Sequence, residues 1–272
     1  MSAAPGPAGQ LLAGKTAIVT GSSRGIGRAI AAAFAAEGAN VMISSRRGPS
    51  LAQTAAEIGA AVGDDDRVGW FEANAGDPAA ARACVDAAVS RFGSADVLVN
   101  NAATNPYYGP MIDIDESRAM KTASVNVVGP LMWTQAAWRA WMQEHGGSVI
   151  NVASIGGYMV EPNIGFYNVT KAALLHLTRQ LAAELGPGVR VNGIAPGLVK
   201  TDMARALWEG REDVVAANVP LRRLGTTGDI ASAAVFLASE QAGWITGHTI
   251  AVDGGILVDG VVARGRAEAG NE

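Results

Sequence analysis

Two side chains at helical spacing, Tyr167 and Lys171, are the clearest candidates for chemistry in this sequence. Residues four apart lie on the same face of a helix, so the phenol and the ammonium would be neighbours. A free tyrosine has a pKa of about 10, which is too high for efficient acid–base work near neutral pH. Because a nearby ammonium stabilises phenolate, we expect Lys171 to lower the pKa of Tyr167. The pair therefore predicts a tyrosine that transfers protons, provided that other groups of a reaction site surround it.

A glycine-rich loop at 21–27 follows a short apolar run and opens an Ala-rich stretch. Gly21 permits a tight turn, Gly25 lets the backbone approach a pyrophosphate, and Gly27 allows close packing of helix on strand. Free N–H groups and the positive end of the helix would then face the phosphates. The loop is expected to bind a dinucleotide through Gly21, Ser23, Arg24, Gly25, Ile26 and Gly27.

Short β-branched runs alternate with longer Ala- and Leu-rich segments. The runs are nearly continuous in apolar residues, as in strands buried on both faces, and they occupy 16–20, 40–44, 68–72, 96–100, 148–152, 189–194 and 249–252. Helices are expected at 24–37, 49–61, 77–92, 115–144, 165–186 and 227–239. This alternation predicts an α/β domain with a doubly wound, seven-stranded parallel sheet and helices on both faces. Ligands bind such sheets at the carboxyl ends of the strands, so the chemistry should follow the first, fourth, fifth and sixth strands.

The domain organisation follows from the same pattern. One dinucleotide-binding domain is expected over 13–260, with flexible tails at 1–12 and 261–272 that are rich in small residues. The segment 198–218 is too long for a simple connection between the sixth strand and the last helix. Its apolar residues Met203, Leu207 and Trp208 leave two interpretations open, a mobile lid over a substrate or a static pair of surface helices.

Composition and charge exclude several classes of protein. Of the 272 residues, 49% are hydrophobic and 17% are charged, which is typical of a globular protein rather than a disordered or fibrous one. The net charge is −4 and no run of Lys or Arg occurs, so nucleic-acid and membrane partners are not expected. The first residues lack a secretory signal, no apolar run reaches the roughly 20 residues of a membrane span, and the single cysteine, Cys84, fits a reducing compartment. We therefore expect a cytoplasmic protein. The histidines are scattered without metal-ligand spacing, so no catalytic metal is expected.

Further motifs give the chain a resemblance to the short-chain dehydrogenase/reductase superfamily. The glycine spacing is G-x-x-x-G-x-G, and the run 100–103, Asn-Asn-Ala-Ala, follows the fourth strand where the family has Asn-Asn-Ala-Gly. The change of the last glycine to Ala103 slightly narrows the room beside the cofactor. Pro196 and Gly197 follow the sixth strand, again in the family's order. The resemblance covers almost the whole body and implies a single Rossmann-like domain.

The resemblance implies a catalytic set that consists of Asn126, Ser154, Tyr167 and Lys171. Ser154, which lies 13 residues before Tyr167, would bond the substrate oxygen and hold the carbonyl near the nicotinamide. Tyr167 would protonate that oxygen as hydride reaches the carbonyl carbon, and Lys171 would also bond the nicotinamide ribose. Asn126 would position a water that links Lys171 to solvent. Pro130 is expected to kink this helix and leave backbone groups free for such a water.

The end of the second strand indicates which dinucleotide binds. An acid there would bond the ribose of NAD and repel a 2′-phosphate, but the run 44–47 is Ser-Ser-Arg-Arg. Arg46 and Arg24 can both present guanidinium forks to the phosphate, and in the family basic residues at these positions accompany NADP. We therefore expect NADP(H). The other cofactor contacts that the resemblance implies are Asn74, Ala75, Asn101, Ala102, Tyr167, Lys171, Pro196, Gly197, Val199 and Thr201.

These features predict an enzyme that reduces a small carbonyl compound with NADPH. The runs 101–106, 167–171 and 196–201 resemble a branch of the family with carbonyl and retinal reductases. A 3-oxoacyl-acyl-carrier-protein reductase is an alternative, weakened because 141–145 and 181–185 lack the Lys or Arg that hold the acidic carrier. An alcohol or sugar dehydrogenase that works oxidatively with NAD(P) is another. A non-catalytic nucleotide-binding protein is disfavoured because no catalytic residue is missing.

The substrate mouth and the oligomer complete the predictions. The mouth should be mostly apolar, with contributions from Tyr107, Tyr108, Met111, Ile155, Tyr158, Met159, Met203 and Trp208. The long helix at 115–144, which in this family packs against a partner subunit, carries Trp133, Trp138 and Trp141. We expect these tryptophans to make core and oligomer contacts, in a homotetramer or a homodimer.

Overall fold

The computed structural model of the protein describes residues 10–259. Residues 1–9 of the expected N-terminal tail and the whole expected C-terminal tail, 261–272, lie outside that range. Seven parallel strands form one sheet in the order β3-β2-β1-β4-β5-β6-β7. They are β1 (Thr16–Thr20), β2 (Asn40–Ser45), β3 (Val68–Glu72), β4 (Val97–Asn100), β5 (Gly147–Val152), β6 (Val189–Pro196) and β7 (Thr249–Val252). From β1 the chain winds outward to β3, returns to β4 beside β1, and winds outward again to β7. The doubly wound α/β fold that the sequence predicts is confirmed.

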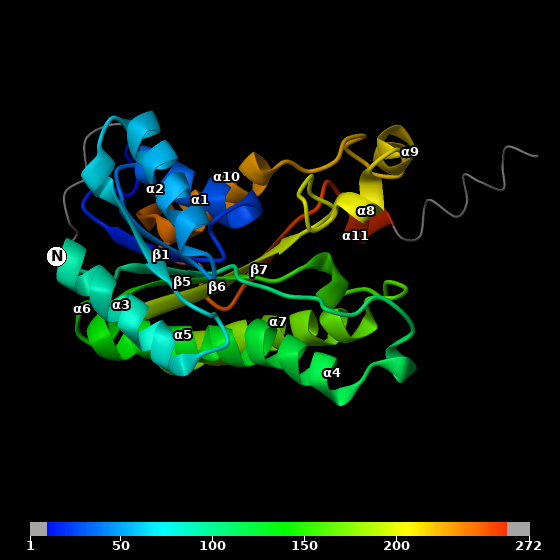
Figure 1. Cartoon of the computed structure of the whole chain (residues 1–272), viewed down its shortest axis with the longest axis horizontal. Helices are drawn as coiled ribbons and strands as arrows, with labels where there is room; N and C mark the ends of the chain where they lie inside the picture. The colour runs from blue at the N-terminus through cyan, green and yellow to red at the C-terminus, as the bar shows by residue number, and fades with distance from the viewer. Residues whose placement is uncertain (1–9, 260–272) are drawn as a thin grey trace, which may run out of the picture.

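Helices cover both faces of the sheet (Figure 1). One face carries α1 (Gly25–Ala36), α2 (Gly48–Val62) and α10 (Thr227–Ala238). The other carries α3 (Pro78–Phe92), α4 (Glu116–Ala123), α5 (Gly129–Ala137), α6 (Gln143–His145) and α7 (Gly165–Leu185). The two layers bury separate apolar clusters against the sheet, one around Phe34 and one around Trp133.

Burial of the strands differs between the centre and the edges of the sheet. Every residue of β1 and β4 is buried, as the apolar runs predict. The edge strands differ from that prediction, because Trp70 of β3 is 46% exposed and no residue of β7 is fully buried. An edge strand has a neighbour on one side only, and its apolar run does not reveal this position.

The long helix expected at 115–144 is continuous but not regular. A π-helical turn at Ser124–Val128 separates α4 from α5, and another at Trp138–Met142 separates α5 from α6. Pro130 follows the first of these turns, and it has no N–H to donate to the carbonyl of Asn126 four residues earlier. The expected distortion at this proline therefore takes the form of a π-helical turn.

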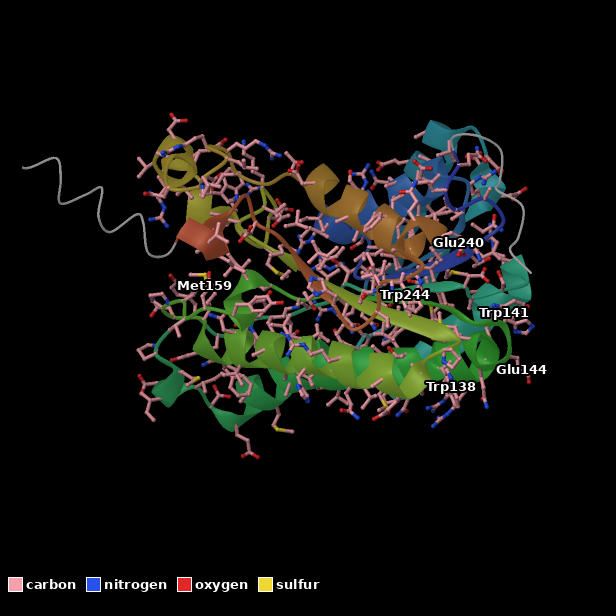
Figure 2. All side chains as sticks on the ribbon, turned by 180° about the vertical axis from the view of Figure 1, so that it is seen from behind. Trp138, Trp141, Glu144, Met159, Glu240 and Trp244 are labelled. Atoms are coloured by element: carbon pink, nitrogen blue, oxygen red, sulfur yellow. The ribbon has the colours of Figure 1, made fainter. Side chains whose placement is uncertain are left out.

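The aromatic residues of this helix have different surroundings. Trp133 is 1% exposed, and its Nε1 donates to the carbonyl of Ala75 at 3.2 Å, so it belongs to the core of its own chain. Trp138 and Trp141 are half-buried at the far end of the helix group, where Figure 2 shows them beside Glu144. Cys84 is fully buried and burial raises its thiol pKa to about 12, so it packs as an apolar residue.

Two further segments bear on the domain boundaries. Leu12 is buried in the core and its N–H donates to the carbonyl of Glu37 at 2.9 Å, so the packed body includes a residue placed in the expected N-terminal tail. The segment 198–218 contains two short helices, α8 (Arg205–Trp208) and α9 (Glu212–Ala217). A last short helix, α11 (Ile256–Asp259), lies near α8 (Figure 1). Whether the segment 198–218 closes over a substrate stays a prediction.

Candidate active site

The ends of the central strands and the start of α7 bring the catalytic candidates together. Ser154 lies in the turn after β5, where its Oγ accepts a hydrogen bond from the N–H of Gly156 at 3.1 Å. Tyr167 lies in the first turn of α7, close enough to Ser154 for that hydroxyl to lower the pKa of its phenol. Lys171 lies one turn later on the same face of the helix, with its Nζ 5.4 Å from the centre of the Tyr167 ring. Three of the four predicted catalytic side chains therefore form one group.

Lys171 is a buried cation, with only 2% of its surface exposed. Its Nζ donates to the carbonyl of Val152, the last residue of β5, at 2.8 Å. Burial lowers the pKa of the Lys171 ammonium from 10.5 to about 7, because desolvation disfavours the charged form. The side chain is therefore held where it can gain or lose a proton near neutral pH.

The pKa of Tyr167 moves opposite to the direction that the spacing predicts. Desolvation raises the pKa of the phenol, and the negative charge of Glu161 raises it further, whereas the hydrogen bond from Ser154 lowers it. The expected lowering by Lys171 is absent from these causes. Burial lowers the pKa of Lys171 to about 7, so the lysine has already lost its proton at the high pH where the free phenol would ionise, and it does not lower the pKa of Tyr167.

Asn126 lies in the π-helical turn and is 1% exposed. Its Oδ1 accepts from the N–H of Thr104 at 2.9 Å, and its Nδ2 donates to the carbonyl of Thr104 at 3.0 Å and to the hydroxyl of Thr170 at 3.1 Å. Thr170 in turn donates to the carbonyl of Tyr167 at 2.7 Å. The side chain of Asn126 thus joins the loop after β4 to the catalytic helix. Because both of its polar atoms are engaged, the water that the sequence predicts beside Asn126 would have to bind its backbone carbonyl.

The glycine loop has the geometry that its spacing predicts. Gly21 and Gly25 both have positive φ, of 65° and 58°, which favours glycine. A Cβ on Gly27 would lie 2.4 Å from Nδ2 of Asn101 and 2.5 Å from the carbonyl oxygen of Gly21. The same Nδ2 donates to the carbonyl of Thr20 at 2.9 Å, so Asn101 ties the loop to the end of β4. Ser23, Arg24 and Ile26 lie within this loop or at the start of α1.

The two arginines proposed to face a 2′-phosphate are both at the surface. Arg46 is exposed after β2, and Arg24 precedes α1 with its Nη1 3.7 Å from Oδ2 of Asp202. A carboxylate to which the sequence did not point also lies here, because Oε2 of Glu72 accepts from the N–H of Gly48 at 3.0 Å. Glu72 belongs to β3, and only the pairing of β2 with β3 brings it to this position.

The remaining predicted contacts lie on the neighbouring loops. Oδ1 of Asn74 accepts from the N–H of Gly76 at 3.2 Å, and the N–H of Ala102 donates to Oγ1 of Thr20 at 3.1 Å. Pro196 ends β6, and the N–H of Gly197 donates to the carbonyl of Val252 at 3.0 Å. Val199 is buried, and Cγ2 of Thr201, two residues later, lies 3.7 Å from where a Cβ on Gly25 would be. Thr201 therefore borders the glycine loop from the side of β6.

Comparison with known proteins gives the family. Residues 21–257 match the family model described as enoyl-(acyl carrier protein) reductase. The chain is 41% identical over 247 residues to dehydrogenase/reductase SDR family member 4 of Sus scrofa, across 90% of this chain and 88% of that protein. The chain belongs to the short-chain dehydrogenase/reductase family. It is therefore an oxidoreductase, as the sequence predicts.

Two solved short-chain dehydrogenase/reductase structures are similar along nearly their whole length. A blue fluorescent protein from a metagenomic library, in complex with NADPH, has a TM-score of 0.82 and 35% identity over 91% of this chain and 99% of its own. A gluconate 5-dehydrogenase from Burkholderia cenocepacia, in complex with NADP and tartrate, has a TM-score of 0.85 and 30% identity over 92% and 98%. The single α/β domain of the present chain is thus the architecture of its relatives.

The two loops that carry most of the residues predicted to line a substrate mouth contact each other. The N–H of Gly109, in the loop after β4, donates to the carbonyl of Asn163, in the loop before α7, at 2.8 Å. Of the apolar residues predicted here, Ile155 is buried, Tyr107 is half-buried, and the others are exposed to different degrees. The exposed fractions are 68% for Tyr108, 50% for Met111, 45% for Tyr158, 38% for Met159 and 64% for Met203. Trp208 is half-buried, and its Nε1 has no hydrogen-bond partner among the described residues.

A buried polar chain beneath the site escaped the sequence analysis. Nδ2 of Asn100 donates to Oδ1 of Asn151 at 2.9 Å, and Nδ2 of Asn151 donates to the hydroxyl of Thr178 at 2.9 Å. All three residues are at most 3% exposed, so these bonds join β4, β5 and α7 across the core. The available signal was the presence of an asparagine at the end of each of two apolar strands.

Glu161 and Asn168 also interact near the site, and no role was predicted for either residue from the sequence. Asn168 follows Tyr167 and is buried, and with its amide oriented to satisfy both bonds it donates to Oε2 of Glu161 at 3.2 Å and accepts from the N–H of Glu161 at 3.3 Å. Burial raises the pKa of the Glu161 carboxyl, and the bond from Asn168 opposes that rise. What could have pointed to this pair in the sequence is that Glu161 is a single acidic residue in an otherwise uncharged loop.

Residues 10–259 contain neither a candidate metal site nor a candidate membrane span. No group of three or more His, Cys, Asp or Glu residues there is arranged to hold a metal ion. None of the helices in the same range has both the length and the apolar character needed to cross a membrane.

Proposed function

We propose that this protein reduces a small carbonyl compound with NADPH and that Tyr167 is the proton donor. The observation that carries the proposal is that Ser154, Tyr167 and buried Lys171 lie close together. They lie at the carboxyl ends of the strands, at the edge of the sheet where the glycine loop also lies. Such a group has the parts needed to orient a carbonyl oxygen and protonate it.

The residues present fit a nicotinamide dinucleotide. The helix α1 begins without a side-chain cap, so its first N–H groups are available to phosphates. A Cβ built on Gly25 would be in ordinary van der Waals contact with Thr201, 3.7 Å away, and it would stand in the left-handed conformation that favours glycine. Nζ of Lys171 uses one of its three protons for Val152, so the others can reach ribose hydroxyls.

In the proposed reaction the substrate oxygen lies between Ser154 and Tyr167 and accepts hydrogen bonds from both hydroxyls. When bound, NADPH supplies the hydride that reduces the carbonyl carbon. Tyr167 gives its phenolic proton to the oxygen as negative charge develops there, and protonated Lys171 stabilises the phenolate that remains. The raised pKa of Tyr167 supports this direction, because the phenol keeps its proton at neutral pH until the oxygen becomes more basic. The backbone at Asn126 would hold the water that returns a proton.

Several observations support NADPH over NADH. Arg24 and Arg46 are exposed arginines beside the glycine loop and the end of β2, where they can pair with a 2′-phosphate. Two similar structures were solved with NADPH or NADP. We expect phosphate binding to take Arg24 from Asp202, because a dianionic phosphate attracts the guanidinium more strongly than one carboxylate.

A second candidate is oxidation of a sugar alcohol or sugar acid. The similarity to a gluconate 5-dehydrogenase favours it. That direction requires phenolate rather than phenol, so the raised pKa of Tyr167 would make the rate increase with pH. Reduction of a carrier-linked 3-oxoacyl thioester is the third possibility that the sequence leaves open.

The experiment is a steady-state panel of ketones, aldehydes, acyl thioesters and sugar alcohols with NADPH, NADH and their oxidised forms. We expect reduction of ketones or aldehydes with a higher kcat/KM for NADPH than for NADH. Tyr167→Phe should lower kcat at least about 100-fold, since it removes the proton donor. Tyr108→Phe removes a phenol that is 68% exposed in the predicted mouth, so it should change KM for the substrate rather than kcat.

Three outcomes would overturn the proposal. Equal kcat/KM for NADH and NADPH would refute the roles of Arg24 and Arg46. Wild-type turnover by Tyr167→Phe would refute the mechanism. Activity confined to carrier-linked thioesters, or to sugar alcohols, would replace the substrate class.

The oligomeric state and the compartment stay predictions from the sequence. Trp138 is half-buried on the long helix, where it could make contacts in a homotetramer or homodimer. Trp133 and Trp141 have partners within their own chain, since Nε1 of Trp141 donates to Asp96 at 3.2 Å and its ring stacks on His145. A cytoplasmic location is expected from the single cysteine. Size measurement in solution would test the first, and fractionation of the source cell would test the second.

A further inference from the structure

The loop between Ser154 and α7 carries one charged residue, Glu161, that the proposed reaction does not use. We propose that the Glu161 carboxylate determines substrate specificity: it favours neutral carbonyl compounds and rejects those with a negative charge next to the carbonyl. The inference rests on the proposed function, because it takes the substrate oxygen to lie between Ser154 and Tyr167.

The Glu161 carboxylate packs against residues that adjoin the two groups proposed to contact the substrate oxygen. It bonds Asn168, the residue that follows Tyr167 on α7, at 3.2 Å. On its other side lies Gly156, whose N–H bonds the Ser154 hydroxyl at 3.1 Å. A Cβ on Gly156 would lie 2.5 Å from Oε2 of Glu161 and 2.1 Å from the side-chain amide of Asn168. The turn after Ser154 therefore requires a glycine where the carboxylate and the amide pack.

The backbone around Glu161 is fixed as well. Asn163 has a φ of 65°, a left-handed conformation that asparagine tolerates better than most residues, and it forms a turn with Pro162 directly after Glu161. The carbonyl of Asn163 accepts from the N–H of Gly109 at 2.8 Å, which joins this turn to the opposite loop of the mouth. The position of the carboxylate thus follows from bonds to α7 and to the loop after β4, rather than from a free side chain.

The charge of Glu161 acts on the site without an ion-pair partner of its own among the described residues. It contributes to the raised pKa of Tyr167, so its field reaches the phenol that would contact the substrate. Within residues 10–259, none of the ion pairs includes Glu161. The residues that precede it in the loop, Tyr158 and Met159, are uncharged and partly exposed. An anionic group beside the carbonyl would therefore meet a like charge with no partner.

The test uses a matched pair of substrates, methyl benzoylformate and benzoylformate, which differ mainly by one negative charge beside the ketone. Dissociation constants are measured by calorimetry with the enzyme saturated in NADP⁺, and kcat/KM is measured with NADPH. Wild type should bind the ester more tightly than the acid. Glu161→Gln, which keeps the shape and can still accept from Asn168, should narrow that preference by about tenfold through tighter binding of the acid.

Glu144→Gln is the matched control, since Glu144 is exposed at the end of the molecule opposite to Met159 (Figure 2). It should leave the ratio of the two dissociation constants unchanged. Comparing ratios between variants removes the greater intrinsic reactivity of the ester. An equal loss for both substrates in Glu161→Gln would show a structural role and overturn the proposal, as would an unchanged ratio or a wild type that prefers the acid.

The proposed function has a separate readout in the same experiment. If wild type and Glu161→Gln differ as expected in binding but the ester is not reduced with NADPH, the charge selection stands and the reaction is wrong. If the ester is reduced but the ratio does not change in Glu161→Gln, the reaction stands and the role of Glu161 is wrong.

Discussion

Lys171 is expected to destabilise the folded protein even though the proposed reaction requires it. The side chain is 2% exposed, and burial lowers its pKa from 10.5 to about 7. An ammonium in this position is therefore much less favourable in the folded chain than in the unfolded one. We expect Lys171→Met to abolish turnover and, at neutral or acid pH, to stabilise the protein without cofactor.

The magnitude follows from the pKa values. A fall from 10.5 to about 7 corresponds to roughly 5 kcal/mol against the charged folded form. Replacing the side chain also removes the hydrogen bond to Val152, and the unpaired carbonyl costs about 1–3 kcal/mol. Below about pH 7 the variant should therefore be about 2–4 kcal/mol more stable than wild type.

The difference should disappear or change sign as the pH rises. Between about pH 7 and pH 10.5 the unfolded chain keeps the lysine proton that the folded chain has lost, so wild-type stability rises with pH across this interval. At about pH 9.5, one unit below the pKa of the lysine in the unfolded chain, a penalty of only about 1.4 kcal/mol remains against the lysine. The lost hydrogen bond then outweighs or balances it, so Lys171→Met should range from about equal in stability to about 2 kcal/mol less stable than wild type.

Urea unfolding at about pH 6 and about pH 9.5, at one protein concentration, measures both differences. Lys121→Met is the control because Lys121 is exposed on α4, and its effect should be small at both values. Saturating NADPH should reverse the order near neutral pH, since only wild type keeps the ammonium that would bond the ribose. A variant that is less stable than wild type at about pH 6, or a difference that does not vary with pH, would refute the reasoning.

Two further predictions concern groups that hold the site in place. Gly27→Ala should lower the free energy of unfolding by about 1–3 kcal/mol and weaken NADPH binding in a fluorescence titration, because the added Cβ would meet Asn101 and the backbone of Gly21. Gly188→Ala is the control, because a Cβ there would have nothing within 4 Å, and it should change neither quantity. Thr170→Val should lower kcat and stability, the latter by about 1–3 kcal/mol, because it removes the hydroxyl that joins Asn126 to the catalytic helix. Thr170→Ser should restore both, and equal activity of the valine and serine variants would contradict the role.

The strand pattern and the glycine spacing were sufficient to predict the fold. Runs such as 16–20 and 97–100 are mostly apolar and buried throughout, because helices cover parallel strands on both faces, and such runs stand out in a sequence. The boundaries were less determined. The strand β6 continues to Pro196 and Leu12 joins the core, since hydrogen bonds and packing from distant residues decide where an element ends.

The candidate site was predictable where it depends on local spacing. The separation of Tyr167 from Lys171 is one helical turn, and the positive φ of Gly21 follows from the turn after β1. What a residue meets across the fold was not predictable. The bond between Asn126 and Thr170, and the approach of Glu72 to Gly48, join residues far apart in the chain.

The electrostatics of the site were decided by the tertiary structure alone. The sequence identified Tyr167 and Lys171, yet it predicted a lower pKa for the phenol because it places a cation nearby and contains no measure of burial. In the folded chain desolvation acts on both groups, and Glu161 adds a negative charge to the phenol. The free energy of a charge depends on the solvent and the charges that surround it in three dimensions, and these are properties of the packed structure rather than of the order of residues.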